Sequence, residues 1–409
     1  MNSEDIITLL FNIISIFYAF RGLQIAATIV RNWGSLKKPG FTPQSKSLAS
    51  QASFFVAVPV GVFFHELSHA LAVWLFGGQV LEFNYRVFWG SVLPGGNFTA
   101  AQDWFIALAG TLGSLVFGLV CWLALKNNNS PTFRYFGLRA FRFQIFFSLI
   151  YYPVFTLLGF YGDWRTIYDF TATPLLSGET AILHAGMLLW FWRTDRSGFF
   201  EMGAFGSPET KSKVTALEAR VAANPYDPAL QLQLIDVYRQ GGMANKAKQL
   251  TQKFIKENPR SGEGYLQMAL LEEAGKREVP AKAKAYAAQA LSLGLGNPEV
   301  TASAYQVLGR YNLTVNKPQE AIEQLSQALG ALKATTNQGL LISVLYYRAQ
   351  AYRRKEQYDA AYQDIQRAIQ LTENGNQEAA LTFLNRELET IYNHSGRSAS
   401  QFSNSTNQS

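Results

Sequence analysis

Two histidines and a glutamate at helical spacing are the residues of this chain best suited to chemistry. His65, Glu66 and His69 form a His-Glu-x-x-His motif. Residues four apart lie on one face of a helix, so both imidazoles are directed at one point. Two histidines with a neighbouring glutamate are typical of a hydrolytic zinc site. We therefore expect His65 and His69 to be zinc ligands and Glu66 to activate water, with a third ligand from elsewhere.

The motif lies in a strongly apolar stretch. Between Ser53 and Phe76, Glu66 is the only formally charged residue. Polar side chains at membrane depth are costly, so a group of three indicates a functional site. The alternative is a soluble helix whose two histidines are only hydrogen-bonded. The apolar flanks favour a metal site inside a membrane.

Asp163 and His184 are the candidates for the third ligand. Asp163 follows Pro153 in an apolar segment, and proline disfavours a straight helix there. Two histidines and one carboxylate leave a fourth zinc position open for water. We favour Asp163 as the ligand. Two alternatives stay open, namely an Asp163–Arg165 pair at a helix end and ligation by His184.

Several segments are long and apolar enough to position these residues within a bilayer, since a spanning helix needs about 20 mostly apolar residues. The predicted spans are Ile6 to Val30, Ser53 to Phe76, Trp104 to Leu125, about Phe143 to Phe170, and Pro174 to Trp192. We therefore expect a multipass transmembrane helical domain with about five spans.

Loop charge gives this domain an orientation. Most basic residues follow the first, third and fifth segments, whereas the other side has only Arg86 and Arg165. The residues that follow those three segments are Arg31, Lys37, Lys38, Lys46, Lys126, Arg134, Arg139, Arg142, Arg193 and Arg196. Positive loops stay on the cytoplasmic side. We therefore expect the C-terminal half on the cytoplasmic or equivalent side. The second and fourth segments then run in the same direction.

Composition excludes other classes of function. The net charge is +7, but the excess lies beside apolar segments, where membrane orientation and lipid contact explain it better than nucleic acid. Cys121 is the single cysteine and allows no internal disulfide. The fold therefore does not depend on an oxidising compartment.

A short hairpin is expected between the second and third segments. Residues 83–89 show partial alternation of apolar and polar side chains, and a turn signal follows at Pro94 to Asn97. An exposed strand edge near a protease centre could hold an extended peptide by main-chain pairing. An interfacial loop anchored by aromatic side chains is the alternative.

Residues from about 53 to 170 resemble the site-2 protease family of intramembrane zinc metalloproteases. The resemblance rests on the His65 to His69 helix, on Gly77 and Gly78 after it, and on Asp163. It implies that His65, His69 and Asp163 bind Zn²⁺, that Glu66 activates water and that substrates are transmembrane proteins. The chain differs from the family pattern before the aspartate, since Pro153 stands alone and Trp164 follows Asp163.

The C-terminal half has a helical-pair pattern. Small and large apolar residues recur at fixed offsets in units of about 34 residues, which is similar to tetratricopeptide repeats. The offsets are clearest at Tyr305, Leu308, Gly309, Ala321, Leu325, Ala328, Ala349, Tyr352, Ala361 and Ala368. A capping helix is expected at Gln377 to Tyr392. Such arrays bind a peptide or protein partner on their concave face.

The predicted fold class is thus all-α, a multipass membrane domain followed by a tetratricopeptide-like α-solenoid. The expected parts are a metalloprotease-like domain at 1–195, a linker at 196–212, repeats at 213–393 and a disordered tail at 394–409. The function expected is intramembrane proteolysis with repeats that recruit a substrate or regulator. The alternative is a catalytically inactive membrane scaffold. A soluble zinc protease conflicts with the apolar segments.

Overall fold

The protein is seen here as a computed structural model that describes residues 3–158, 162–333, 335–374 and 378–396. Most of the predicted tail, from residue 397 on, lies outside the described residues. The chain forms two compact units, one of residues 1–218 and 240–246 and the other of residues 219–239 and 247–409. The predicted domain limits stay predictions.

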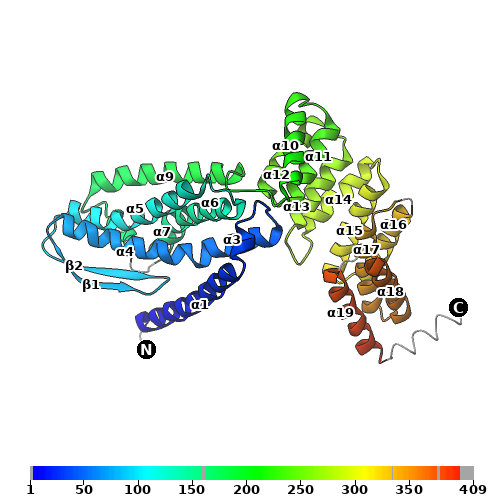
Figure 1. Ribbon diagram of the computed structural model, residues 1–409, viewed down its shortest axis with the longest axis horizontal. Helices are drawn as coiled ribbons and strands as arrows, with labels where there is room; N and C mark the ends of the chain where they lie inside the picture. The colour runs from blue at the N-terminus through cyan, green and yellow to red at the C-terminus, as the bar shows by residue number, and fades with distance from the viewer. Residues whose placement is uncertain (1–2, 159–161, 334, 375–377, 397–409) are drawn as a thin grey trace. The chain divides into compact units, whose positions relative to one another are not determined.

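The first unit is helical apart from one hairpin (Figure 1). Its helical elements are α1 (Ser3–Arg31), α2 (Trp33–Leu36), α3 (Pro43–Phe55), α4 (Ala57–Leu75), α5 (Ala100–Leu125), α6 (Pro131–Phe146), η1 (Phe147–Tyr151), α7 (Tyr152–Leu157), α8 (Trp164–Ile167) and α9 (Pro174–Arg196). The η1 element is one turn of π-helix between α6 and α7.

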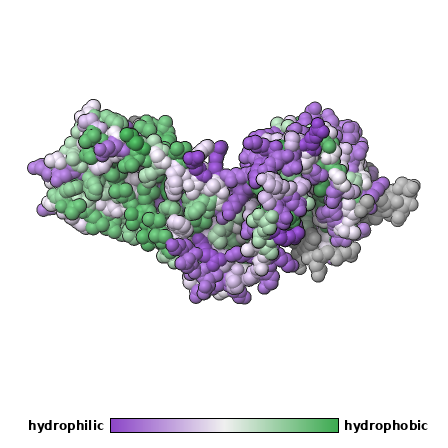
Figure 2. Space-filling view, turned by 90° about the horizontal axis from the view of Figure 1, so that it is seen from above, coloured by the Kyte–Doolittle hydropathy of each residue, from purple (hydrophilic) through white to green (hydrophobic). Residues whose placement is uncertain are grey.

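Four helical stretches in the described residues are long and apolar enough to cross a membrane. They are Leu9–Arg31, Pro43–Leu75, Ala100–Leu125 and Pro131–Leu157. Figure 2 shows the matching hydrophobic surface over this unit. The α9 helix, predicted as a fifth span, forms over 23 residues but is not among the four. The fourth span begins earlier than predicted because α6, η1 and α7 continue one another, which places Arg139 and Arg142 in a helix instead of a loop.

Contacts between the helices fix their directions. The Ser114 hydroxyl of α5 donates to the Gly61 carbonyl of α4, and His69 of α4 contacts the Ile106 carbonyl of α5. Ascending positions on α4 thus meet descending positions on α5, which makes the two helices antiparallel. Gly118 of α5 lies against Gln144 of α6, and Cys121, later in α5, lies against Gly137, earlier in α6. These two contacts show that α5 and α6 are antiparallel as well. It follows that α4 and α6 run in the same direction, as the loop charges predicted.

The hairpin forms, but its turn differs from the prediction. Strands β1 (Gln79–Tyr85) and β2 (Gly90–Gly95) pair antiparallel from Gln79 opposite Gly95 to Tyr85 opposite Gly90. The turn lies at residues 86–89, where the Arg86 amide donates to the Trp89 carbonyl. The predicted turn at Pro94 was wrong, since Pro94 lies within β2 and pairs with Val80 of β1. A proline without an N–H is tolerated there because a two-stranded sheet has only edge strands.

The second unit is a tetratricopeptide-like solenoid of helix pairs, as predicted. Helix α10 (Pro208–Ala223) begins in the first unit, and the following helices are α11 (Pro228–Gln240), α12 (Ala244–Glu257), α13 (Gly262–Glu273), α14 (Ala281–Leu293), α15 (Pro298–Thr314), α16 (Pro318–Leu332), α17 (Gln338–Arg354), α18 (Tyr358–Asn374) and α19 (Glu378–Ser395). From α13 to α19, each helix packs against the next one along the array (Figure 1). The predicted cap corresponds to α19, whose Leu384 and Ile391 are buried.

Small residues allow the paired helices to approach. Ala321, Leu325 and Ala328 of α16 are all fully buried. Gly309 of α15 faces Leu325 so closely that a Cβ at position 309 would lie 2.5 Å from Leu325 Cγ. The fixed offsets in the sequence therefore mark the helix–helix contacts of the repeats.

We expect Gly309→Ala to destabilise the repeats by about 1–3 kcal/mol, because overpacking a close helix contact costs that much. Gly330→Ala is the matched control, since nothing lies within 4 Å of a Cβ placed on that exposed helical position. The control should stabilise α16 by about 0.4–1 kcal/mol. Thermal unfolding of the full chain, with hydrogen exchange in α15 and α16, measures both effects. Equal stability of the two variants would contradict the packing argument.

Candidate metal centre

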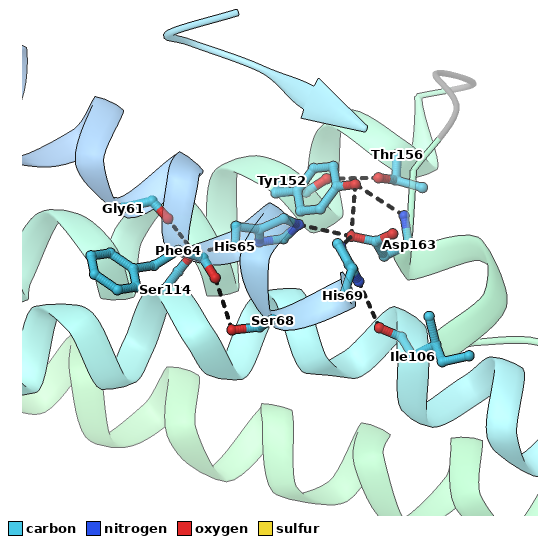
Figure 3. Close-up of polar contacts among 10 residues, drawn as sticks. All are labelled: Gly61, Phe64, His65, Ser68, His69, Ile106, Ser114, Tyr152, Thr156 and Asp163. Carbon is cyan, nitrogen blue, oxygen red and sulfur yellow. Dashed lines mark hydrogen bonds and ion pairs between the residues drawn. The ribbon is translucent and has the colours of Figure 1, made fainter. Parts of the chain in front are cut away.

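Three side chains from two distant parts of the chain meet at one point (Figure 3). His65 and His69 come from successive turns of α4, and Asp163 immediately precedes α8. The Asp163 Oδ2 atom lies 3.0 Å from His65 Nε2 and 3.1 Å from His69 Nε2. One donor atom from each residue lies within 4.8 Å of the other two. The structure thus brings together the three residues that the sequence analysis proposed as metal ligands.

Contacts with α5 orient both imidazoles. His69 Nδ1 donates its proton to the Ile106 carbonyl at 2.6 Å, which leaves Nε2 unprotonated and directed at the centre. His65 Nδ1 lies 3.4 Å from the Ser114 hydroxyl. Partners of this kind on the second ring nitrogen fix the tautomer and the orientation of metal-binding histidines.

Gly110 of α5 makes room for the imidazoles. A Cβ at this position would lie 2.3 Å from His69 Nε2 and 2.6 Å from His65 Nε2. Any side chain at position 110 would therefore occupy the space around the two donor atoms. The sequence showed Gly110 only as part of a row of small residues every four positions, a signal for close helix packing.

Tyr152 holds Asp163 at the site. Its hydroxyl donates to Asp163 Oδ2 at 3.0 Å and accepts from the Asp163 backbone N–H at the same distance. Sequence reasoning missed Tyr152, because an aromatic residue in an apolar span gives no signal that separates it from its neighbour Tyr151. Its position directly before Pro153 was the one available hint.

Glu66 is buried beside the three residues, with 4 % of its surface exposed. A Cβ at Gly90 of β2 would lie 2.5 Å from Glu66 Cγ, so the hairpin covers this side chain closely. Within the described residues the Glu66 carboxylate forms no hydrogen bond or ion pair with another side chain. The carboxylate thus lies beside the three residues without being held in an ion pair, where it could contact a water molecule at the centre.

His184 lies away from this centre. Its Nε2 donates to the Leu149 carbonyl at 2.7 Å, and its Nδ1 contacts the Tyr168 hydroxyl. Its ring lies against Trp164, with the ring centroids 4.5 Å apart. Both nitrogens of His184 are thus engaged within the protein, and Asp163 is the third side chain at the two histidines.

The donor set fits zinc. Two neutral imidazoles and one carboxylate are a usual ligand set of catalytic zinc, at about 2.0–2.2 Å from the ion. Two donor atoms that bind one zinc ion at these distances, with tetrahedral angles between them, lie about 3.3 Å apart. The distances from Asp163 Oδ2 to the two imidazole nitrogens, 3.0 and 3.1 Å, are close to this value. The space at Gly110 and the buried Glu66 carboxylate beside the three residues also fit a metal with a water beside it.

The chain thus combines four helical stretches that could cross a membrane, a His-His-Asp group that could hold a metal ion, and a tetratricopeptide-like solenoid. Residues 49–192 match the family described as Peptidase M50B-like, which confirms the resemblance of this half to the site-2 proteases. No curated protein matches the chain.

Three solved structures are similar to this chain. MamA is 21 % identical over 40 % of this chain and 89 % of its own, with a TM-score of 0.30. TTC0263, a thermophilic TPR protein of Thermus thermophilus, is 20 % identical over 43 % and 88 %, with a TM-score of 0.32. The Cut9–Hcn1 hetero-tetramer of APC/C is 14 % identical over 88 % and 71 %, with a TM-score of 0.37. Scores this low carry no argument about function.

Proposed function

We propose that this protein is an intramembrane zinc metalloprotease that cleaves peptide bonds of transmembrane protein substrates. The observation that carries the proposal is the buried Glu66 carboxylate beside His65, His69 and Asp163, which in the described part of the chain forms no hydrogen bond or ion pair with a side chain. A purely structural metal site has no use for a base at this position. The apolar helices around the site support a reaction in or near the bilayer.

The residues have separate roles in this reaction. His65, His69 and Asp163 would hold Zn²⁺, which when bound supplies Lewis acidity toward the scissile carbonyl. A Glu66 carboxylate oxygen takes the proton of the attacking water and delivers it to the leaving amine nitrogen. The contacts of the imidazoles with Ile106 and Ser114 keep the site preorganised, so little rearrangement is needed during the reaction.

The hairpin is the candidate substrate-binding element. Gly90 of β2 lies against Glu66, and Tyr85 of β1 donates its hydroxyl to the Pro59 carbonyl of α4 at 3.1 Å. A peptide must be extended to be cleaved, because helical carbonyls are already hydrogen-bonded. Main-chain pairing with a free edge of β1 or β2 would hold an extended substrate next to Glu66.

The repeats are the candidate recruiting element. Solenoids of stacked helix pairs present long surfaces for peptides or proteins. We infer that this unit binds a substrate or a regulator on the cytoplasmic or equivalent side, the side that the loop charges favour. Membrane lipid surrounds the apolar helices of the other unit.

The proposal is tested with the full chain reconstituted in lipid vesicles together with a panel of single-span proteins. We expect cleavage fragments that depend on added zinc and disappear with a chelator. Mass spectrometry of the fragments then locates the cleaved bond. If the chain binds zinc and captures single-span proteins but never cuts them, it is a membrane scaffold and the protease proposal is wrong.

A further inference from the structure

The helix that precedes Asp163 departs from α-geometry where it passes the metal centre. Residues Phe147–Tyr151 form a π-turn, and the Tyr152 N–H donates to the Phe147 carbonyl five residues back. Pro153 follows and has no N–H to donate. The Leu149 carbonyl, four residues before Pro153, therefore lacks its normal α-helical partner.

His184 of α9 supplies the missing donor. Its Nε2–H reaches the Leu149 carbonyl at 2.7 Å, and the Tyr168 hydroxyl contacts its Nδ1. A carbonyl without a partner at membrane depth would be costly, so this contact stabilises the irregular turn. Single π-turns inside α-helices are found frequently at functional sites.

The side chain that follows the π-turn is Tyr152, and it contacts the metal centre in two ways. Its hydroxyl bonds both the carboxylate and the backbone N–H of Asp163, each at 3.0 Å. Its ring lies edge-on to His65, with centroids 5.6 Å apart. Figure 3 shows the Tyr152 hydroxyl directed at Asp163 from above the two histidines.

Gly162 allows this approach. A Cβ at position 162 would lie 2.9 Å from the Tyr152 hydroxyl oxygen and 2.8 Å from the Thr156 hydroxyl oxygen. A residue with a side chain would push the loop away from Tyr152. The close contact of the loop with the hydroxyl thus depends on the absence of a side chain at Gly162.

We propose that Tyr152 is a positioning residue that holds the Asp163 carboxylate at His65 and His69, and that the π-turn braced by His184 places it there. Asp163 comes from a loop, whereas the histidines come from a regular helix. The loop ligand is therefore the one that needs an external partner to keep its position. The inference rests on the metal site of the proposed function, and it adds the residue that keeps that site assembled.

The test is the metal affinity of Tyr152→Phe in the full chain. This change removes only the hydroxyl and keeps the ring against His65. We expect zinc to bind about 10–100-fold more weakly, the usual cost of losing a partner of a metal ligand. We also expect the visible absorption bands of the Co²⁺-substituted protein to shift, because the geometry of the carboxylate ligand changes.

Tyr151→Phe is the matched control. Tyr151 is the preceding residue, its ring stacks on Phe155, and its hydroxyl has no hydrogen bond in the part of the chain that the structure describes. This variant should keep the native zinc affinity and the native Co²⁺ spectrum. Equal loss in both variants would show that any hydroxyl deletion in this helix disturbs the site, and would overturn the assignment to Tyr152.

A double substitution tests whether Tyr152 acts through Asp163. We expect Tyr152→Phe combined with Asp163→Asn to bind zinc no more weakly than Asp163→Asn alone, because residues in one hydrogen-bonded unit are not additive. Additive losses would overturn the positioning role. So would native affinity and a native Co²⁺ spectrum in Tyr152→Phe, even if kcat fell, since Tyr152 would then act on the substrate.

These measurements need no substrate, so they separate the two proposals. A native chain that binds zinc but cleaves nothing refutes the protease function and leaves the role of Tyr152 open to the same test. A native chain that binds neither zinc nor Co²⁺ overturns both.

Discussion

We expect replacement of Glu66 by glutamine to slow peptide-bond cleavage strongly and to leave zinc binding unchanged. Glutamine has nearly the volume of glutamate, so the contact with Gly90 of the hairpin is kept. It accepts no proton, however, so the attacking water loses its general base, and we expect kcat to fall by a factor on the order of 10²–10⁴. Zinc should stay at the native stoichiometry because His65, His69 and Asp163 are unchanged. Fragment release and zinc content of the purified protein measure the two effects.

Glu179→Gln is the control for this substitution. Glu179 is an exposed residue of α9, so the same chemical change is made away from the centre. It should leave cleavage at the native rate. Native cleavage by Glu66→Gln would refute the role of Glu66 as the base, and loss of zinc in that variant would show that Glu66 is itself needed for metal binding.

Replacement of Gly110 by alanine displaces both histidines. The added Cβ would lie 2.3 Å from His69 Nε2 and 2.6 Å from His65 Nε2, and real contacts with a Cβ are almost never that short. The imidazoles or the α5 backbone must then move by about 1 Å, a displacement that costs on the order of 10²-fold in activity. We expect zinc affinity to fall along with cleavage, because the displaced atoms are the proposed zinc ligands. Competition with a chelator measures the affinity.

Gly186→Ala is the matched control, since it makes the same change within a helix of the same unit. Nothing lies within 4 Å of a Cβ at this position of α9. This variant should bind zinc and cleave as the native chain does, with unchanged helical content by circular dichroism. Native zinc affinity in Gly110→Ala would contradict the geometry of the centre.

The two largest effects differ in how far the sequence alone foretold them. Glu66 belongs to a motif that can be read from five consecutive residues. Gly110 appeared in the sequence only as a small residue in a helix, because nothing local shows that its missing side chain leaves space for His65 and His69 on another helix. The packing of α4 on α5 alone gives Gly110 this role.

The same division applies to the rest of the fold. Apolar segments and repeat offsets predicted the membrane helices and the solenoid, because helix formation and amphipathic packing depend on local patterns. The limits of the fourth span and the position of the hairpin turn were predicted wrongly. Both depend on contacts that continue or interrupt an element, such as the π-turn that joins α6 to α7 and the pairing of Pro94 with Val80.

The sequence by itself determined which residues can do chemistry here and in what surroundings, since the spacing of His65 and His69 fixes their common face once a helix forms. Tertiary structure alone decided that Asp163, 94 residues after His69, lies against both imidazoles, while His184 bonds the Leu149 carbonyl instead. It also placed Tyr152 on Asp163. The physical reason is that a side chain in a loop takes its position from the packing of distant helices. The spacing of residues along the sequence does not predict that packing.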